Sequence, residues 1–228
     1  MSAFNIRSMI ATVSADIVRS TSMNTEDLIV LRGKLRDLFH DFEEDYPGFW
    51  ARIVKGDSIE CVVPNYHDAL RLAILIKLYV KKSVSELECS EMLQRYGIRF
   101  SIGVADIKYA DKKEDIIDGP AIYLSGRNLD EISRKENIMS AFEIEQAPRS
   151  LSNLLDSYVA MVSGIVDSYS AKQAEVVFLK LLGFKEMEIS ERVGISQSSV
   201  NTRATNARWG LLNTAIMDFE ALEIEQIS

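Results

Sequence analysis

The first part of the chain alternates between short apolar runs and longer amphipathic segments. Continuous or alternating apolar positions predict strands over residues 8–15, 49–54, 58–63, 99–105 and 141–144. Apolar residues at helical spacing predict helices over residues 25–42, 66–82, 85–96 and 120–132. Thr25 is the expected N-cap of the first of these helices. The charged stretch 111–118 is expected to form a loop.

This order of elements predicts the architecture of the first part. Strand, helix, hairpin, helix, strand, helix and strand follow one another, which favours an antiparallel α+β sandwich of ferredoxin-like type with its helices on one face. Pro148 marks a boundary, and the remainder has helical periodicity. We therefore expect an α+β domain over residues 1–147, a connecting helix over 148–168 and an all-α domain over 169–228. The connecting helix is apolar enough to pack on the first domain, which we favour, or on a second copy.

The last sixty residues contain clear helix boundaries. Ser170 and Gln173 have the spacing of a capping box, and a second short helix over 185–193 is expected to bury Met187, Ile189 and Val193. Gly194 then suits a left-handed turn residue, and Ser196 suits the N-cap of a third helix. Two short helices joined by such a turn are typical of a helix-turn-helix.

The third helix has two different sides. Its apolar side consists of Val200, Ala204 and Ala207. Its first turns carry side chains that can read base edges and bind phosphates, with a further arginine downstream: Gln197, Ser198, Ser199, Asn201, Thr202, Arg203 and Arg208. The chain has a net charge of −8, yet no acidic residue lies between Arg192 and Ile216. A polyanion could approach there, although a helical bundle that only packs or dimerises is the alternative.

This C-terminal segment resembles the helix-turn-helix of sigma-factor region 4 and related bacterial regulators. The matching residues are 173–176, 188–191, 194–196, 199–203 and 207–208. The resemblance implies that double-stranded DNA is a partner of this segment.

Four segments of the first domain resemble a class III nucleotidyl cyclase domain over about residues 8–145. They are residues 16–21, 55–57, 99–104 and 119–127. Combined with the helix-turn-helix, the chain is similar to the SatD family of small bacterial proteins. The resemblance implies that Asp16 and Asp57 stand where cyclases hold metal ions, and two such carboxylates could bind Mg²⁺.

Other positions depart from the cyclase pattern. Arg19 and Ser20 replace a glycine and an aromatic residue. Arg127 matches the arginine that acts on the transition state, but Tyr123 stands where an asparagine is expected and Ile53 where a purine-reading lysine is expected. Loss of one transition-state donor costs about 10²–10³ in rate. We therefore do not expect cyclisation.

Three interpretations of the first domain stay open. It could sense Mg²⁺ and a nucleotide or other phosphate through Asp16, Asp57, Arg19 and Arg127 without turnover. It could be a structural remnant whose aspartates pair with Arg19, Arg52 or Arg127, since two buried carboxylates repel each other without a cation. It could also be an enzyme with altered chemistry, such as a phosphohydrolase.

Taken together, the sequence favours a homodimeric bacterial DNA-binding regulator of transcription over an enzyme and leaves residual enzymatic activity open. The alternative is a Mg²⁺-dependent, nucleotide-acting enzyme with a helical partner-binding tail; an adaptor that contacts RNA polymerase is a further one. The most apolar stretch, residues 69–80, contains Arg71, so no membrane span is expected. Two cysteines without a CxxC pattern and the lack of a secretory pattern favour the cytoplasm.

Overall fold

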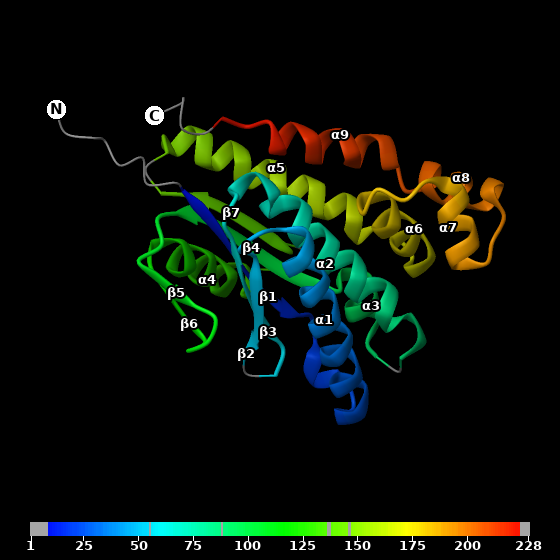
Figure 1. Ribbon diagram of the computed structural model, residues 1–228, viewed down its shortest axis with the longest axis horizontal. Helices are drawn as coiled ribbons and strands as arrows, with labels where there is room; N and C mark the ends of the chain where they lie inside the picture. The colour runs from blue at the N-terminus through cyan, green and yellow to red at the C-terminus, as the bar shows by residue number, and fades with distance from the viewer. Residues whose placement is uncertain (1–8, 55, 88, 136–137, 146, 224–228) are drawn as a thin grey trace.

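The computed structural model describes residues 9–54, 56–87, 89–135, 138–145 and 147–223 (Figure 1). Three short 3₁₀ turns are η1 (Ser20–Ser22), η2 (Tyr66–Asp68) and η3 (Val84–Glu86). The strands are β1 (Ile10–Ile17), β2 (Trp50–Val54), β3 (Ser58–Val63), β4 (Ile98–Ala105), β5 (Tyr109–Asp111), β6 (Ile116–Asp118) and β7 (Ser140–Ile144). The helices are α1 (Thr25–Asp45), α2 (Ala69–Ser83), α3 (Glu91–Tyr96), α4 (Pro120–Ser133), α5 (Arg149–Asp167), α6 (Ala171–Leu181), α7 (Glu186–Val193), α8 (Gln197–Asn206) and α9 (Trp209–Glu220).

The main sheet has the order β2-β3-β1-β4-β7. Strand β1 is central and pairs antiparallel with both β3 and β4, whereas β7 adds to β4 in parallel. The first four strands of this order, together with α1 and α2, form a β-α-β-β-α-β unit. Along the chain its elements are β1, α1, β2, β3, α2 and β4. The expected α+β fold with a ferredoxin-like, mainly antiparallel sheet is therefore confirmed.

Helices cover both faces of the sheet, so the expectation of helices on one face was wrong. Val13 of β1 belongs to the buried cluster that contains α1 and α2. Thr12 and Ser14 point to the other face, where their hydroxyls lie 2.9 and 2.8 Å from Ser125 Oγ of α4. Gly103 of β4 allows this close contact, because a Cβ there would lie 2.4 Å from a backbone oxygen of α4.

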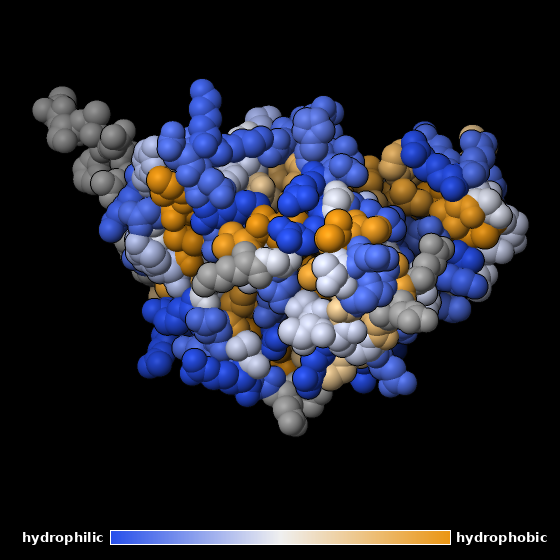
Figure 2. All heavy atoms as spheres, turned by 90° about the horizontal axis from the view of Figure 1, so that it is seen from below, coloured by the Kyte–Doolittle hydropathy of each residue, from blue (hydrophilic) through white to orange (hydrophobic). Residues whose placement is uncertain are grey.

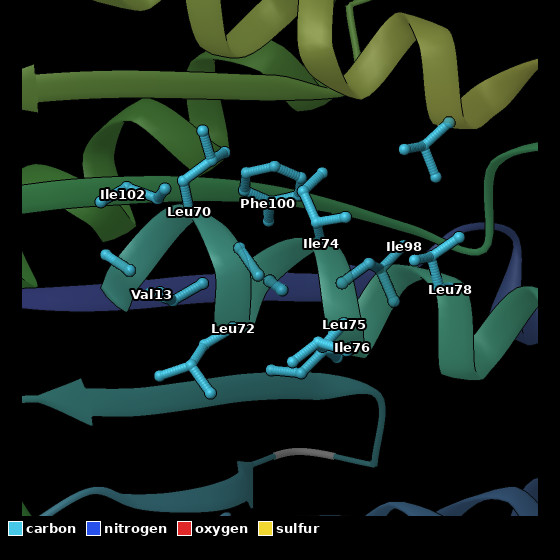
Figure 3. Packing of buried hydrophobic residues seen from close by; sticks show 14 of the residues in the cluster. Val13, Leu70, Leu72, Ile74, Leu75, Ile76, Leu78, Ile98, Phe100 and Ile102 are labelled. Atoms are coloured by element: carbon cyan, nitrogen blue, oxygen red, sulfur yellow. The ribbon is translucent and has the colours of Figure 1, made fainter. Parts of the chain in front are cut away.

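Helix α2 is the centre of the hydrophobic core. Its side chains pack on the strands, as Figure 3 shows for Leu70 and Ile74 beside Phe100. The helices α6 and α9 contact α2 as well, so α2 is buried around most of its circumference. Among the described residues, no helix combines the length and apolarity needed to cross a lipid bilayer. Seen from below, hydrophilic side chains cover most of the surface, with apolar patches between them (Figure 2).

The C-terminal helices return to the α+β part. Helix α5 packs on β7, and α9 runs back beside α5 in the opposite direction (Figure 1). Tyr158 Oη of α5 donates a hydrogen bond to the carbonyl oxygen of Ala215 in α9 at 2.6 Å. Phe219 of α9 meets Phe142 of β7 edge to face, with ring centroids 5.6 Å apart. Helix α5 therefore packs on the chain's own α+β part, as favoured from the sequence.

Several predicted element boundaries need correction. Asn24, not Thr25, caps α1, because Asn24 Oδ1 accepts a hydrogen bond from the Asp27 amide at 2.8 Å. The helix predicted over 85–96 is divided into η3 and α3, and α3 starts after its own N-cap, Ser90. The predicted loop 111–118 contributes to the small β5–β6 hairpin, whose Asp115 side chain lies 3.4 Å from the Arg52 guanidinium.

Candidate functional site

Helices α6, α7 and α8 form a three-helix unit with its own small core. Val176, Ile189, Val200 and Ala204 are buried against one another. The predicted capping box is present at the start of α6: Ser170 Oγ accepts from the Gln173 amide at 3.3 Å, and Gln173 Oε1 accepts from the Ser170 amide at 2.8 Å. The expected order of helices and caps is therefore found.

The turn between α7 and α8 has the predicted geometry. Gly194 has a φ of 69°, a left-handed conformation that favours glycine. The amides of Gly194 and Ile195 both donate to the Ser190 carbonyl, at 3.0 and 3.1 Å. Ser196 Oγ accepts from the Ser199 amide at 3.2 Å and so caps α8. This turn fixes the direction in which α8 leaves α7.

The outer face of α8 is polar and exposed. Its inner side, Val200, Ala204 and Ala207, is buried as predicted. Arg208, exposed and left-handed with a φ of 53°, links α8 to α9. The exposed positions on the outer face carry uncharged hydrogen-bonding side chains: Gln197, Ser198, Asn201, Thr202 and Thr205. We call these five residues the α8 polar face.

Three sequence-predicted positions differ in part. The Arg203 side chain is only 22% exposed, and its guanidinium lies 3.9 Å from Glu175 Oε2 of α6. Ser199 is half-buried, with its hydroxyl 2.9 Å from that of Ser196. Met187, expected to be buried, is 59% exposed. Helix α7 spans only two turns, and Ile189 takes its buried position.

The second set of predicted residues lies at one end of the sheet. Asp16, near the end of β1, pairs in register with Ser58 and with Arg99 on the two neighbouring strands. The Ile17 amide donates to the Asp57 carbonyl at 3.2 Å, which joins the β2–β3 turn to β1. Asp16, Asp57 and Arg19 consequently line one hollow of about 610 Å³. Lys55 of the same sequence motif lies outside the described residues.

Each aspartate already has a hydrogen-bond donor. Arg99 Nε lies 2.7 Å from Asp16 Oδ1, and Ser20 Oγ donates to Asp57 Oδ2 at 2.5 Å. Burial raises the pKa of Asp16 above its ordinary value, and the hydrogen bond and charge of Arg99 oppose that rise. We call Asp16, Arg99, Ser20 and Asp57 the aspartate cluster.

The predicted phosphate-binding arginine of α4 lies elsewhere. Arg127 Nη2 donates to Glu143 Oε2 at 2.9 Å, and Asn128 donates to the same oxygen at 2.8 Å. Arg127 lines a different hollow, between α4, β7 and α5. Arg52 pairs with Glu60 at 2.6 Å. The structure therefore groups Arg19 with the two aspartates and leaves Arg127 apart.

Arg99 is the site residue that sequence reasoning missed. The sequence offers Arg19, Arg52 and Arg127 as the cation beside Asp16, whereas the residue that contacts Asp16 in the structure is Arg99. Its position directly opposite Asp16 depends on the register of β1 and β4, which the sequence pattern does not reveal.

Each carboxylate of the aspartate cluster has one oxygen already in contact with a protein group. Within the described ranges, no three His, Cys, Asp or Glu side chains converge as metal ligands would. Arg99 supplies the positive charge beside Asp16, and the Ser20 hydroxyl occupies an oxygen of Asp57. The arrangement is that of an ion-paired polar cluster at the end of the sheet.

Comparisons with known proteins concern the fold alone. No protein-family model and no curated protein matches the chain. A bacterial light-regulated adenylyl cyclase is similar at 14% identity and a TM-score of 0.45, over 59% of this chain and 75% of that one. The guanylyl cyclase Cya2 is similar at 15% identity and a TM-score of 0.39, over 54% and 70% of the two chains. The similarity to the SatD family stays a prediction.

Proposed function

We propose that this chain is a DNA-binding regulator of transcription and that α8 enters the major groove of double-stranded DNA. The observation that supports the proposal is the α8 polar face, which is exposed and free of acidic side chains in a chain of net charge −8. Behind it, Val200 and Ala204 are buried in the core of the three-helix unit. The three-helix unit therefore presents hydrogen-bonding groups outward, as a helix that reads a groove requires.

The side chains of α8 divide into two kinds of expected contact. Gln197 and Asn201 each carry an amide that can donate to and accept from the edge of an adenine. Ser198 and Thr202 can contact base edges or phosphates. Arg208, exposed at the end of α8, suits a phosphate contact, which adds affinity without sequence preference. Arg203 would have to leave Glu175 to reach DNA.

A Mg²⁺-dependent enzyme that acts on nucleotides is the alternative function. In its favour, Asp16, Asp57 and Arg19 line one hollow. Against it, Arg99 and Ser20 already bind the two carboxylates. In the proposed regulator the α+β part is a scaffold for the C-terminal helices. If this part also senses a nucleotide, the nucleotide would bind in the hollow lined by Asp16, Asp57 and Arg19.

Selection of genomic DNA fragments by the purified full-length protein at physiological salt tests the proposal. We expect enrichment of one sequence motif, followed by a titration of that motif with variants. Gln197→Ala and Asn201→Ala should each weaken binding by about 1–3 kcal/mol, or roughly 5- to 150-fold. Gln94→Ala, an exposed amide on α3, is the matched control and should bind like the wild type.

The proposal fails if no motif is enriched, or if both α8 variants bind the enriched motif as tightly as the wild type. An enriched motif that depends on other residues would leave DNA binding in place and refute α8 as the reading helix. No enrichment, together with capture of RNA polymerase, would favour the adaptor instead.

A further inference from the structure

The side-chain amide of Asn201 is oriented by a neighbour on the same helix. Thr205 Oγ1, one turn further along α8, donates a hydrogen bond to Asn201 Oδ1 at 3.1 Å. Both side chains belong to the α8 polar face and are exposed. A carbonyl oxygen has two lone pairs, so Oδ1 keeps one acceptor site for a ligand, and the Nδ2 group is the donor beside it. The side chain therefore presents an acceptor and a donor side by side.

Adenine is the base whose major-groove edge matches this pair of groups. It offers the N6 amino group as a donor next to N7 as an acceptor, whereas guanine offers two acceptors, N7 and O6. An asparagine amide satisfies both groups of adenine, but its oxygen would face an acceptor of guanine without a hydrogen between them. Gln197, exposed one turn earlier on α8, carries the same amide and has the same match.

The two threonines of the α8 polar face use their hydroxyl hydrogens within the protein. Thr205 donates to Asn201, and Thr202 Oγ1 donates to the carbonyl oxygen of Ser198 at 2.8 Å. A hydroxyl has one hydrogen, so neither threonine has a donor left for the acceptors of guanine. The methyl group of Thr202 can instead contact the C5-methyl group of thymine, the partner of adenine.

The charged side chains that read guanine are not part of this face. Arginine and lysine bind the O6 and N7 atoms of guanine, and the five residues of the α8 polar face include neither. The guanidinium of Arg203 lies 3.9 Å from Glu175 Oε2. That of Arg192, on α7, lies 4.1 Å from the centroid of the Phe184 ring. The surface that would face the base edges is therefore built from amides and methyl groups.

We infer that α8 reads adenine–thymine base pairs, that Gln197 and Asn201 each bind one adenine, and that Thr205 is a positioning residue for Asn201. The inference rests on the proposed function, because it names the base pairs that the α8 polar face reads. Residues four apart on a helix lie about 6 Å apart along its axis, or about two base-pair steps. The two adenines should therefore lie within about three consecutive base pairs, on either strand.

Selection by the full-length protein from double-stranded DNA with a randomised core tests the inference. We expect adenine at the positions whose preference is lost in Gln197→Ala and in Asn201→Ala. Replacement of the adenine read by Asn201 with 7-deazaadenine removes N7 and should weaken wild-type binding by about 2- to 12-fold, the loss of one hydrogen bond. The same base analogue should have no further effect on Asn201→Ala. Replacement of guanines in the same duplex with 7-deazaguanine is the control and should not change binding.

Thr205→Val tests the positioning role, because it removes the hydroxyl and keeps the branched shape. It should lower the preference for adenine at the Asn201 position at least about 2-fold and leave the preference at the Gln197 position unchanged. Thr205→Ser keeps the hydroxyl and should retain the wild-type preference. Thr214→Val, at an exposed position of α9, is the matched control and should select the same sequences as the wild type.

The results separate this inference from the proposed function. Guanine at the positions lost in Gln197→Ala and Asn201→Ala, or full tolerance of 7-deazaadenine, overturns the inference and leaves DNA binding by α8 in place. A Thr205→Val variant with the wild-type preference refutes the positioning role of Thr205. A randomised core from which no sequence is enriched refutes the proposed function itself, and the inference with it.

Discussion

Arg71 and Glu220 lie 149 residues apart and are joined by two parallel hydrogen bonds, Nε to Oε1 at 2.5 Å and Nη2 to Oε2 at 3.0 Å. The third nitrogen of the same guanidinium, Nη1, donates to the Leu181 carbonyl at the end of α6 at 3.0 Å. One arginine of α2 therefore holds both α6 and α9. Through these contacts, the position of the three-helix unit is linked to the core of the α+β part.

Arg71→Met should lower the free energy of unfolding by about 2 kcal/mol. The substitution leaves Glu220, only a quarter exposed, without its partner and the Leu181 carbonyl without its donor. Urea unfolding measures the change. Arg36→Met, at an exposed position of α1, is the control and should change the free energy by less than about 0.5 kcal/mol. Equal unfolding midpoints for Arg71→Met and the wild type would contradict the prediction.

A second prediction concerns Lys77 and Lys81, two buried lysines of α2. Lys81 Nζ donates to the carbonyl of Arg95 at the end of α3 and, at 3.3 Å, to that of Asp167 at the end of α5. Burial, and next the charge of Lys77, lower the pKa of Lys81 to about 8. The unfolded chain keeps a value near 10.5. Between about pH 8 and pH 10.5, Lys81 therefore keeps its proton in the unfolded chain but has lost it in the folded chain.

The deprotonation of Lys81 should therefore raise the stability as the pH rises above about 8, and this one group contributes at most about 1.4 kcal/mol per pH unit. Lys77, whose pKa burial also lowers, acts in the same direction. Buried Cys61 and Tyr169 have raised pKa values and act in the opposite direction once their unfolded forms ionise, which ends the rise. Urea unfolding at pH 8 and one unit higher measures the slope.

Lys81→Met should lessen this dependence, whereas Lys34→Met at an exposed position of α1 should keep it. If Lys81→Met instead keeps the pH dependence of the wild type, the ammonium of Lys81 is held by its carbonyl partners as strongly as burial disfavours it.

The third prediction concerns the aspartate cluster. Arg99→Met removes the cation beside Asp16, so the pKa of Asp16, already raised by burial, should rise further. The loss of stability should be about 2 kcal/mol at neutral pH. It should shrink as the pH falls through the folded pKa of Asp16, because protonation removes the unpaired charge. Unfolding in urea at several pH values measures it, and a loss that does not depend on pH would contradict the assignment.

Mg²⁺ distinguishes this arrangement from the enzyme alternative. Arg99 and Ser20 already contact the carboxylates of Asp16 and Asp57. We therefore expect the wild type to have the same unfolding midpoint in Mg²⁺ as in NaCl of equal ionic strength. A midpoint that rises with Mg²⁺ alone, and no longer does so in Asp57→Asn, would instead support a metal-dependent function.

Local signals predicted the C-terminal part well. The capping box of Ser170 with Gln173, the left-handed Gly194 and the N-cap Ser196 each depend on residues within a few positions along the chain. The short-range spacing of side chains and backbone amides determines these features, so the sequence alone could locate them.

Contacts between distant segments could not be predicted in the same way. Asp16 meets Arg99 across 83 residues, and hydrophobic alternation identifies both strands without stating which residues are opposite. Thr12 and Ser14 lie in a strand that the sequence predicts, and both are buried, but their partner Ser125 of α4 is more than 110 residues away and no local pattern identifies it. Pairing register and helix position are tertiary properties, so they appear only in the structure.

Arg208 provides a test of how α8 would meet the phosphate backbone. Each phosphate neutralised by an arginine releases condensed counterions, so Arg208→Ala should lower the slope of log K against log salt by about one. The preference for the enriched motif over unrelated DNA should change little, since a phosphate contact carries no base information. Titrations at several salt concentrations measure both quantities, with Arg36→Ala as the control. An unchanged slope would place Arg208 away from the phosphates.

Glu175 should act against DNA binding, and its neutralisation should strengthen it. Its carboxylate lies 3.9 Å from the Arg203 guanidinium and is 39% exposed, so it competes with phosphate for that arginine. Glu175→Gln keeps the shape of the side chain, removes one negative charge near α8 and frees Arg203. We expect the affinity for the enriched motif to rise by a few-fold, in keeping with about 0.2–1 kcal/mol for a partly exposed ion pair. In an Arg203→Ala background, Glu175→Gln should raise the DNA affinity by less, because the arginine that it would free is absent. An equal gain in both backgrounds would mean that Glu175 acts on the phosphates directly and that Arg203 stays with the protein.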